Sequence, residues 1–337
     1  MKISSEKKKA IRTYLLEKIE QGSPALSKAV ADALSLDQST VHTYINELVS
    51  EGVIERIRRG EYRLLSSRHS RTFSRSTGEL NSDTYAFNTF LSPYLKEFPE
   101  NVRSIWAYVF SEMMNNVIDH SQSEDVIVTI SQNALNTTVS IQDNGVGIFE
   151  KIRDHFGYES LEDAICELFK GKLTTDLENH SGEGIYFSSR MMDEFAILSS
   201  RKVFAVNKYD ESLLCEQAED PSGGTLVAMK LSNASRRTPR EVFDAFADVE
   251  GGFTRTAIPL KNLFDASPVS RSQAKRLTNR LDRFETVTLD FEGLEWMGQG
   301  FAHQLFVVFQ KAHPEIKLEP VGMNESVARM YTHVTSE

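Results

Sequence analysis

The sequence has few cysteines and lacks a long apolar run. Its 337 residues include only two cysteines, Cys166 and Cys215, without CxxC spacing or a paired histidine. This pattern argues against a zinc site and a disulfide framework, so we expect two buried thiols. No stretch approaches the roughly 18 uncharged apolar residues of a membrane span, and Met1 to Lys9 lack the apolar core of a signal peptide. We therefore expect a cytoplasmic protein without membrane contact.

The composition is that of a globular protein with an uneven charge. Hydrophobic residues make up 40% and charged residues 26% of the chain, and domains usually span roughly 100 to 200 residues, so we expect two or three domains. Residues 1–75 hold 14 lysines and arginines against 9 acidic residues, a charge of +5, whereas the remainder carries −15. A polyanionic partner would therefore contact the N-terminal segment, unless the asymmetry serves solubility alone.

The first 64 residues predict three short helices and a hairpin. Apolar spacing indicates helices over residues 6–21, 25–34 and from about 38 to 51, and two alternating strands follow around Gly60. This order resembles a winged helix-turn-helix. The resemblance implies contacts with double-stranded DNA from the start of the third helix and from the basic wing, through Gln38, Ser39, Thr40, His42, Thr43, Arg56, Arg58 and Arg59. The same fold also serves as a dimerisation or docking module.

Three polar residues in the centre of the chain have helical spacing. Glu112, Asn116 and His120 are each four residues apart and would share one helix face, while Met113 and Val117 pack inward. An amide oxygen can ligate Mg²⁺, a carboxylate can orient water, and an imidazole can donate to phosphate. The spacing alone is more typical of a solvated surface, so its interpretation depends on the motifs further along the chain.

Three glycine motifs come in order after two alternating strands. The first motif is Asp143-Asn-Gly-Val-Gly-Ile148. It places a carboxylate at the end of a strand, followed by glycines that let the backbone pass close beneath a ligand. Ser181-Gly-Glu-Gly-Ile185 precedes an apolar helical stretch, where backbone amides favour phosphate. Gly223-Gly-Thr225 then opens another strand, and its threonine is a further polar candidate.

This ordered set resembles the GHKL (Bergerat-fold) ATP-binding domains, and its Glu-x-x-x-Asn-x-x-x-His run is similar to the anti-sigma-factor serine kinases. The resemblance implies that Asn116 ligates Mg²⁺, that Glu112 is the catalytic base and that Asp143 bonds the adenine amino group. It implies a lid over about residues 149–181. The ATP-binding residues would be Asn116, His120, Asp143, Gly145, Gly147, Ile148, Gly182, Gly184, Ile185 and Thr225.

The C-terminal segment predicts a small α/β domain. Helical and apolar extended stretches alternate beyond about Pro268. The region resembles a STAS-like domain, but its turn reads Met297-Gly-Gln-Gly-Phe301. It therefore lacks the hydroxyl that is phosphorylated in anti-sigma-factor antagonists and is closer to a STAS-like domain of unknown function. Packing or oligomerisation is the simplest role for it.

Together these patterns predict an α+β multidomain protein. The predicted order is a winged helix-turn-helix (1–66), a linker (67–84), a GHKL sandwich with a mixed sheet and helices on one face (85–235), a connector (236–267) and a STAS-like domain (268–337). His69 lacks the surroundings of a histidine-kinase acceptor. We expect an ATP- and Mg²⁺-dependent regulator, with slow hydrolysis as its reset, that controls binding of DNA, a protein partner or a second copy. The alternative is an ATPase or serine/threonine kinase acting on a partner protein.

Overall fold

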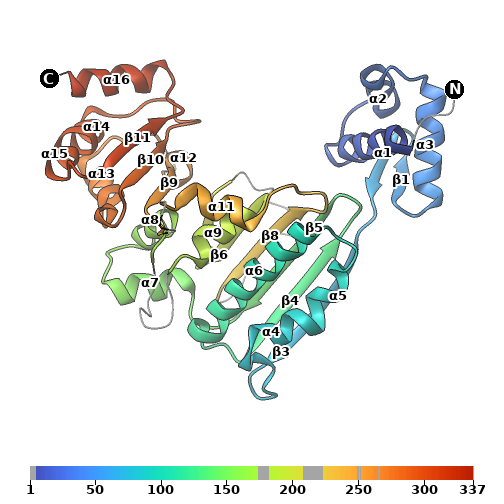
Figure 1. Cartoon of the computed structure of the whole chain (residues 1–337), viewed down its shortest axis with the longest axis horizontal. Coiled ribbons are helices and arrows are strands. Elements are labelled where there is room, and N and C mark those ends of the chain that lie inside the picture. The colour runs from blue at the N-terminus through green and yellow to red at the C-terminus, as the bar shows by residue number, and fades with distance from the viewer. Residues whose placement is uncertain are drawn as a thin grey trace.

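The structure, a computed structural model, describes residues 5–173, 182–207, 223–248, 250, 252–264 and 266–336. Within these residues, helices and strands form an N-terminal, a central and a C-terminal group (Figure 1). None of the helices in the described parts is both long and apolar enough to span a bilayer. Cys166 is buried, as expected, whereas Cys215 lies outside the described residues.

The N-terminal group has its own apolar core. Ile11, Leu15, Val41 and Leu48 pack together because each helix carries its apolar residues on one face. The elements are α1 (Ser5–Glu20), α2 (Leu26–Leu34), α3 (Gln38–Ser50), β1 (Ile54–Arg58) and β2 (Glu61–Leu64). Three helices and an antiparallel hairpin agree with the predicted elements. Their assignment as a winged helix-turn-helix stays a prediction.

The central group contains a six-stranded sheet. Its order is β3-β4-β5-β8-β6-β7, and every pair is antiparallel among the described residues. Our expectation of a mixed sheet was wrong, because β8 inserts between β5 and β6 antiparallel to both. The strands are β3 (Ser67–Ser74), β4 (Asp125–Gln132), β5 (Asn136–Asp143), β6 (Glu194–Ser199), β7 (Lys202–Ala205) and β8 (Leu226–Ser232).

Helices cover one face of this sheet, as predicted (Figure 1). The long helix α6 (Glu100–Asn116) buries Trp106 and Phe110 completely and ends in the π-type turn η3 (Val117–Ser121). The other elements around it are η1 (Glu79–Asn81), α4 (Asp83–Ala86), η2 (Phe87–Leu91), α5 (Ser92–Leu95), α9 (Gly184–Met191) and α11 (Pro239–Phe246).

The linker that we expected over residues 67–84 is absent from the structure. Ser67–Ser74 instead forms β3, the edge strand that pairs with β4 along its whole length. Its polar composition concealed the strand, because an edge strand buries few side chains and here Phe73 alone is fully covered. Two residues, Leu65 and Ser66, therefore separate the N-terminal hairpin from the central sheet.

The expected lid is helical where it is described. It contains α7 (Ile148–Phe156) and α8 (Leu161–Lys170), in agreement with the helical pattern of the sequence. Ser160 caps α8, because its hydroxyl accepts a hydrogen bond from the amide of Asp163. Residues 174–181, including Ser181 of the second glycine motif, lie outside the described residues.

The C-terminal group is a three-stranded parallel sheet in the order β11-β10-β9, with helices around it. Its elements are β9 (Arg255–Pro259), α12 (Leu260–Leu263), α13 (Arg271–Thr278), η4 (Leu281–Arg283), β10 (Thr286–Asp290), α14 (Gln299–His303), η5 (Gln304–Phe309), α15 (Gln310–Ala312), β11 (Lys317–Val321) and α16 (Glu325–Thr335). The connector expected over 236–267 is therefore wrong in part, since β9 belongs to this sheet. We also did not predict α16, which covers Phe306 through Tyr331.

Candidate functional site

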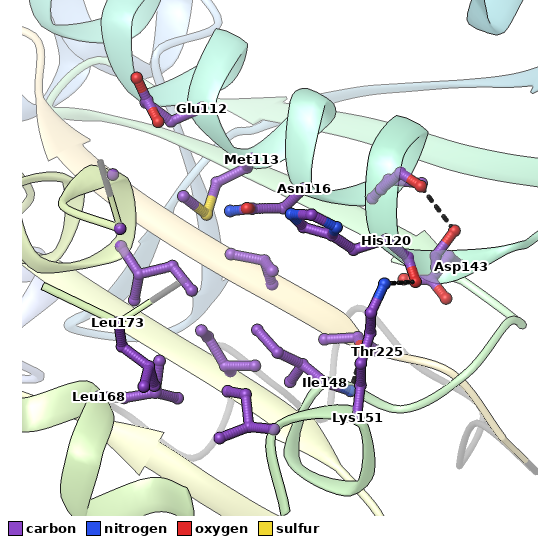
Figure 2. A pocket seen from close by; sticks show the side chains of 18 of the residues that line it. Glu112, Met113, Asn116, His120, Asp143, Ile148, Lys151, Leu168, Leu173 and Thr225 are labelled. Atoms are coloured by element: carbon purple, nitrogen blue, oxygen red, sulfur yellow. Dashed lines mark hydrogen bonds between the residues drawn. The ribbon is translucent and has the colours of Figure 1, made fainter. Parts of the chain in front are cut away.

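Helix α6 presents the three polar residues to a cavity. Its apolar stripe, which includes Trp106 and Phe110, packs into the core. Glu112, Asn116 and His120 lie beside this stripe and line the cavity together with Met113 and Val117. Figure 2 shows these side chains projecting in a row from α6 and its continuation η3. The prediction that these three residues share one face is therefore confirmed, although the last of them lies on a π-type turn.

The cavity has a volume of about 250 Å³ and is bounded by several parts of the central group. Leu168 and Leu173 face the α6 residues from the opposite side (Figure 2). Aliphatic side chains make up part of its lining, namely Val146, Ile148, Ile152, Ile197 and Val227. A pocket with aliphatic side chains and a row of polar groups suits an amphiphilic ligand.

Asp143 is the buried carboxylate of the cavity. It ends β5, is 4% exposed, and accepts a hydrogen bond from the amide of Gly145 at 2.9 Å. Burial disfavours the charged carboxylate and raises its pKa to about 6, against the opposing effect of the hydrogen bonds with Gly145 and Thr225. With this pKa the carboxyl group is still mostly ionised at pH 7, so it can accept a hydrogen bond from a ligand that donates one.

The two glycines after Asp143, Gly145 and Gly147, are not among the residues that line the cavity. A Cβ on Gly145 would overlap the carbonyl oxygen of Ser121, and one on Gly147 would lie 2.5 Å from the hydroxyl of Ser199. The amide of Val146 donates to the same Ser121 oxygen at 2.6 Å. We expected both glycines among the ligand-binding residues. In the structure Gly145 lets the loop approach η3 and Gly147 lets it approach Ser199 at the end of β6, while Val146 and Ile148 line the cavity.

Thr225 joins two walls of the cavity. Its hydroxyl accepts a hydrogen bond from the amide of Ile148 at 3.1 Å, at the start of α7. Its carbonyl accepts another from the amide of Asp143 at 3.0 Å. Thr225 therefore holds the first turn of α7 beside the end of β5, and it also lines the cavity.

The second glycine motif meets α6 at the other end of the cavity. Gly182, Gly184 and Ile185 all line it. A Cβ on Gly184, the first residue of α9, would overlap the carboxylate of Glu112. Gly182 has φ +73° and accepts a hydrogen bond from the amide of Leu173 at 3.0 Å. The start of α9 and the side chain of Glu112 are thus in direct contact.

The sequence did not reveal two side chains of the cavity, Lys151 and Tyr186. Lys151 on α7 donates from Nζ to the carbonyl oxygen of His120 at 2.9 Å, at the carboxyl end of α6 and η3. A cation is favourable at a helix C-terminus. Neither residue belongs to a glycine motif. The sequence pattern of α7 predicts that Lys151 is an ordinary solvent-exposed lysine.

The residues expected to bind DNA lie apart from this cavity, on the N-terminal group (Figure 1). Gln38, Ser39, His42 and Thr43 are exposed at the start of α3, and Thr40 is half-buried. Arg56, Arg58 and Arg59 are exposed on the hairpin. Arg58 pairs with Glu61 and Arg63 pairs with Glu55, so acidic neighbours offset part of the positive charge.

Two family models match parts of the chain. Residues 102–234 match the Histidine kinase-, DNA gyrase B-, and HSP90-like ATPase family, and residues 273–328 match the STAS-like domain of unknown function (DUF4325). No curated protein matches the sequence. The two matches agree with the expected order of a GHKL-type ATPase region followed by a STAS-like region. The first match supports ATP binding by the part of the chain that contains the cavity.

We predict that replacing Asp143 with asparagine removes a pH dependence of stability. The folded-state pKa of about 6 exceeds the ordinary value of 3.8. The folded protein therefore keeps a proton that the unfolded chain releases, and its stability falls as pH rises through this window. The shift corresponds to about 3 kcal/mol.

Urea unfolding of wild type and Asp143→Asn between pH 4 and 8 measures this effect. The stability of the wild type relative to the variant should fall by roughly 2 kcal/mol as pH rises from 4 to 7, because part of the total loss has already occurred at pH 4. Asp282→Asn, at an exposed position in η4, is the control and should show no such trend. A difference that stays constant with pH would contradict the assignment.

Proposed function

We propose that the protein binds ATP with Mg²⁺ in the cavity beside α6, and that the bound nucleotide controls binding of DNA or a protein partner through the N-terminal group. One observation carries the proposal. A single cavity is lined by Glu112, Asn116 and His120 from one helix, by Asp143, and by the Gly182 to Ile185 turn. The family match over residues 102–234 supports the same function.

The chemistry of the cavity fits a nucleotide. A flat, weakly polar base suits the aliphatic side chains of the lining, and the buried carboxylate of Asp143 can accept a hydrogen bond from the adenine amino group. The phosphates would then extend along α6 towards Gly182 and Gly184. Backbone amides at the start of α9 favour phosphate there, because amides at a helix start lack helical partners.

The carboxylate of Glu112 makes a divalent cation necessary in this arrangement. A triphosphate beside a carboxylate would be repelled unless a cation lies between them. Among the described residues, no group of three or more His, Cys, Asp or Glu side chains could hold a metal ion. Mg²⁺ commonly binds through one or two protein oxygens together with substrate phosphates and water. We assign the amide oxygen of Asn116 as the protein ligand of this ion.

Replacing Asn116 with alanine should weaken Mg²⁺-dependent ATP binding by at least about 10-fold, since even indirect ligand changes cost that much at metal sites. Isothermal titration with ATP in Mg²⁺, and in EDTA, measures the effect. Asn115→Ala is the matched control, because its side chain is half-buried on the same helix but does not line the cavity. Equal affinity of Asn116→Ala and wild type would refute the metal assignment.

The regulatory part of the proposal depends on how the N-terminal group is attached. Leu65 and Ser66 alone separate β2 from β3, so the hairpin leads directly into the sheet that forms the cavity. Glu20 also accepts a hydrogen bond from the side chain of Asn136 at 2.7 Å. A change in the central group can therefore reach the exposed surface of α3 and the hairpin without a flexible linker. A protein partner or a second copy could use the same surface.

Nucleotide should change the affinity of the wild type for double-stranded DNA. Fluorescence anisotropy at several salt concentrations, with and without ATP and Mg²⁺, measures both affinity and salt dependence. The salt dependence is the slope of log affinity against log salt concentration. Replacing Arg56, Arg58 and Arg59 with alanine should reduce the magnitude of this slope by about one for each phosphate that the variant no longer neutralises.

Arg240→Ala controls for the loss of an exposed positive charge away from the N-terminal group. DNA binding that nucleotide leaves unchanged would rule out the coupling. If the wild type binds no DNA at low salt, the role of the N-terminal group as a DNA-binding module is wrong, and a protein partner or second copy replaces it.

A second candidate function is hydrolysis or transfer of the γ-phosphate. The contact between Glu112 and the start of α9 favours it, because this contact places a carboxylate beside the expected phosphate end. Glu112 would orient a water molecule, or a partner's hydroxyl, and accept its proton as the new bond to phosphorus forms and the bond to ADP breaks. Hydrolysis would then reset the switch.

Replacing Glu112 with alanine should leave ATP bound but lower turnover by about 10² to 10⁴-fold, the usual contribution of a general base. Phosphate release under single-turnover conditions measures the rate. Glu100→Gln, an exposed acidic residue at the start of the same helix, is the control. A turnover rate in Glu112→Ala equal to that of the wild type would exclude this role.

A further inference from the structure

We propose that the C-terminal group regulates the nucleotide cavity by fixing the position of one of its walls, and that Lys170 is the positioning residue for this contact. The wall consists of Leu168, Gly171 and Leu173, which line the cavity at and beyond the end of α8, and we call it the α8 wall. The inference rests on the proposed function, because it concerns the regulation of the same site.

Lys170 joins α8 to the C-terminal group through a fully buried ammonium. The side chain is 1% exposed, and Nζ donates to Glu167 Oε1 at 2.6 Å within α8. It also donates to the carbonyl oxygens of Arg276 at 3.1 Å and Asn279 at 2.7 Å, at the end of α13. An ammonium has three donors. All three are satisfied here, and two of them hold the backbone of the C-terminal group.

Further polar contacts surround this one. Arg276 pairs with Asp163 in the first turn of α8, and Arg280 lies with Nε 3.7 Å from Glu167. Lys172, just beyond α8, donates from Nζ to the carbonyl oxygen of Arg283 at 2.9 Å. Residues 276–283 therefore contact both ends of α8, which makes it difficult for the helix to move without them.

A second wall of the cavity is attached to the same group. Tyr186 lines the cavity, and its hydroxyl accepts a hydrogen bond from the amide of Ala257 in β9 at 2.9 Å. Arg190, one turn further along α9, donates from Nη2 to the carbonyl oxygen of Ala257 at 2.7 Å. These two side chains therefore hydrogen-bond to the amide and the carbonyl of one residue in β9, the strand at one edge of the C-terminal sheet.

Close packing leaves little room for independent movement. Gly171 has φ +82°, and a Cβ there would lie 2.8 Å from the ring of Phe253 and 2.9 Å from that of Tyr186. The buried apolar residues of the central and C-terminal groups also form one continuous cluster. Packed interfaces transmit displacement because they are dense and poorly compressible. A nucleotide that presses on the α8 wall thus displaces α13 and β9, and by reciprocity a ligand of the C-terminal group changes nucleotide affinity.

Hydrogen exchange and nucleotide kinetics test this coupling in the full chain. In the wild type, ATP and Mg²⁺ should slow amide exchange in α13 and β9. In Lys170→Met, association of a fluorescent ATP analogue should keep its wild-type rate. Its dissociation should become at least about fivefold faster, the lower end of typical coupling between sites, and the nucleotide-dependent protection of α13 should disappear.

Two further variants distinguish a role of Lys170 in positioning the α8 wall from a role in the stability of the fold. Lys202→Met removes an exposed ion pair with Glu162, near the start of α8, and should behave as the wild type. The double variant Glu167→Gln/Lys170→Met removes the buried carboxylate charge, which in Lys170→Met has lost its ammonium partner and keeps only the more distant Arg280 at 3.7 Å. It should recover stability towards urea while keeping the fast dissociation. Recovery of slow dissociation together with stability would overturn the proposal, because Lys170 would then be structural only.

The wild-type measurement is decisive even if Lys170→Met fails to fold. Nucleotide binding without any change of exchange in α13 or β9 would overturn the coupling and leave the proposed function intact. Absence of nucleotide binding by the wild type would instead refute the proposed function, and the inference with it. Arg276→Leu, which removes the half-exposed pair with Asp163, provides an additional variant and should accelerate dissociation in the same direction.

Discussion

The cavity depends on one close backbone contact between the end of η3, which continues α6, and the loop after β5. The amide of Val146 donates to the carbonyl oxygen of Ser121, at a distance that Gly145 permits by lacking a Cβ. This contact sets how far Asp143, on the loop side, lies from His120, on the helix side. Since Thr225 connects the same loop to α7, a shift here would move most groups of the site together.

Local patterns in the sequence predicted the parts of the site that depend on local structure. The spacing of Glu112, Asn116 and His120 defines one helix face, and the glycine motifs mark places where backbone approaches closely. Lys151 and Tyr186 were missed because their position in the cavity follows from how helices pack, which no neighbouring residue indicates.

The same limit explains the errors in the fold. β3 has the composition of a linker, and its pairing partner, β4, is more than 50 residues further along the chain. β9 is separated from β10 by two helices and a 3₁₀ turn, and its strand character depends on the sheet that it joins. The predicted helices of the N-terminal group were confirmed because their apolar stripes are complete within a few turns. The strands that we missed are therefore those that form only because residues distant in the sequence pair with them or bury them.

The direct passage from β2 to β3 limits what the N-terminal group can reach. Two residues span at most about 7 Å, so Leu65 and Ser66 leave almost no volume for this group to explore independently. The hydrogen bond between Asn136 and Glu20 further restrains this group against the central sheet. A molecule that contacts α3 and the hairpin would therefore be held within a short distance of the edge of the central sheet.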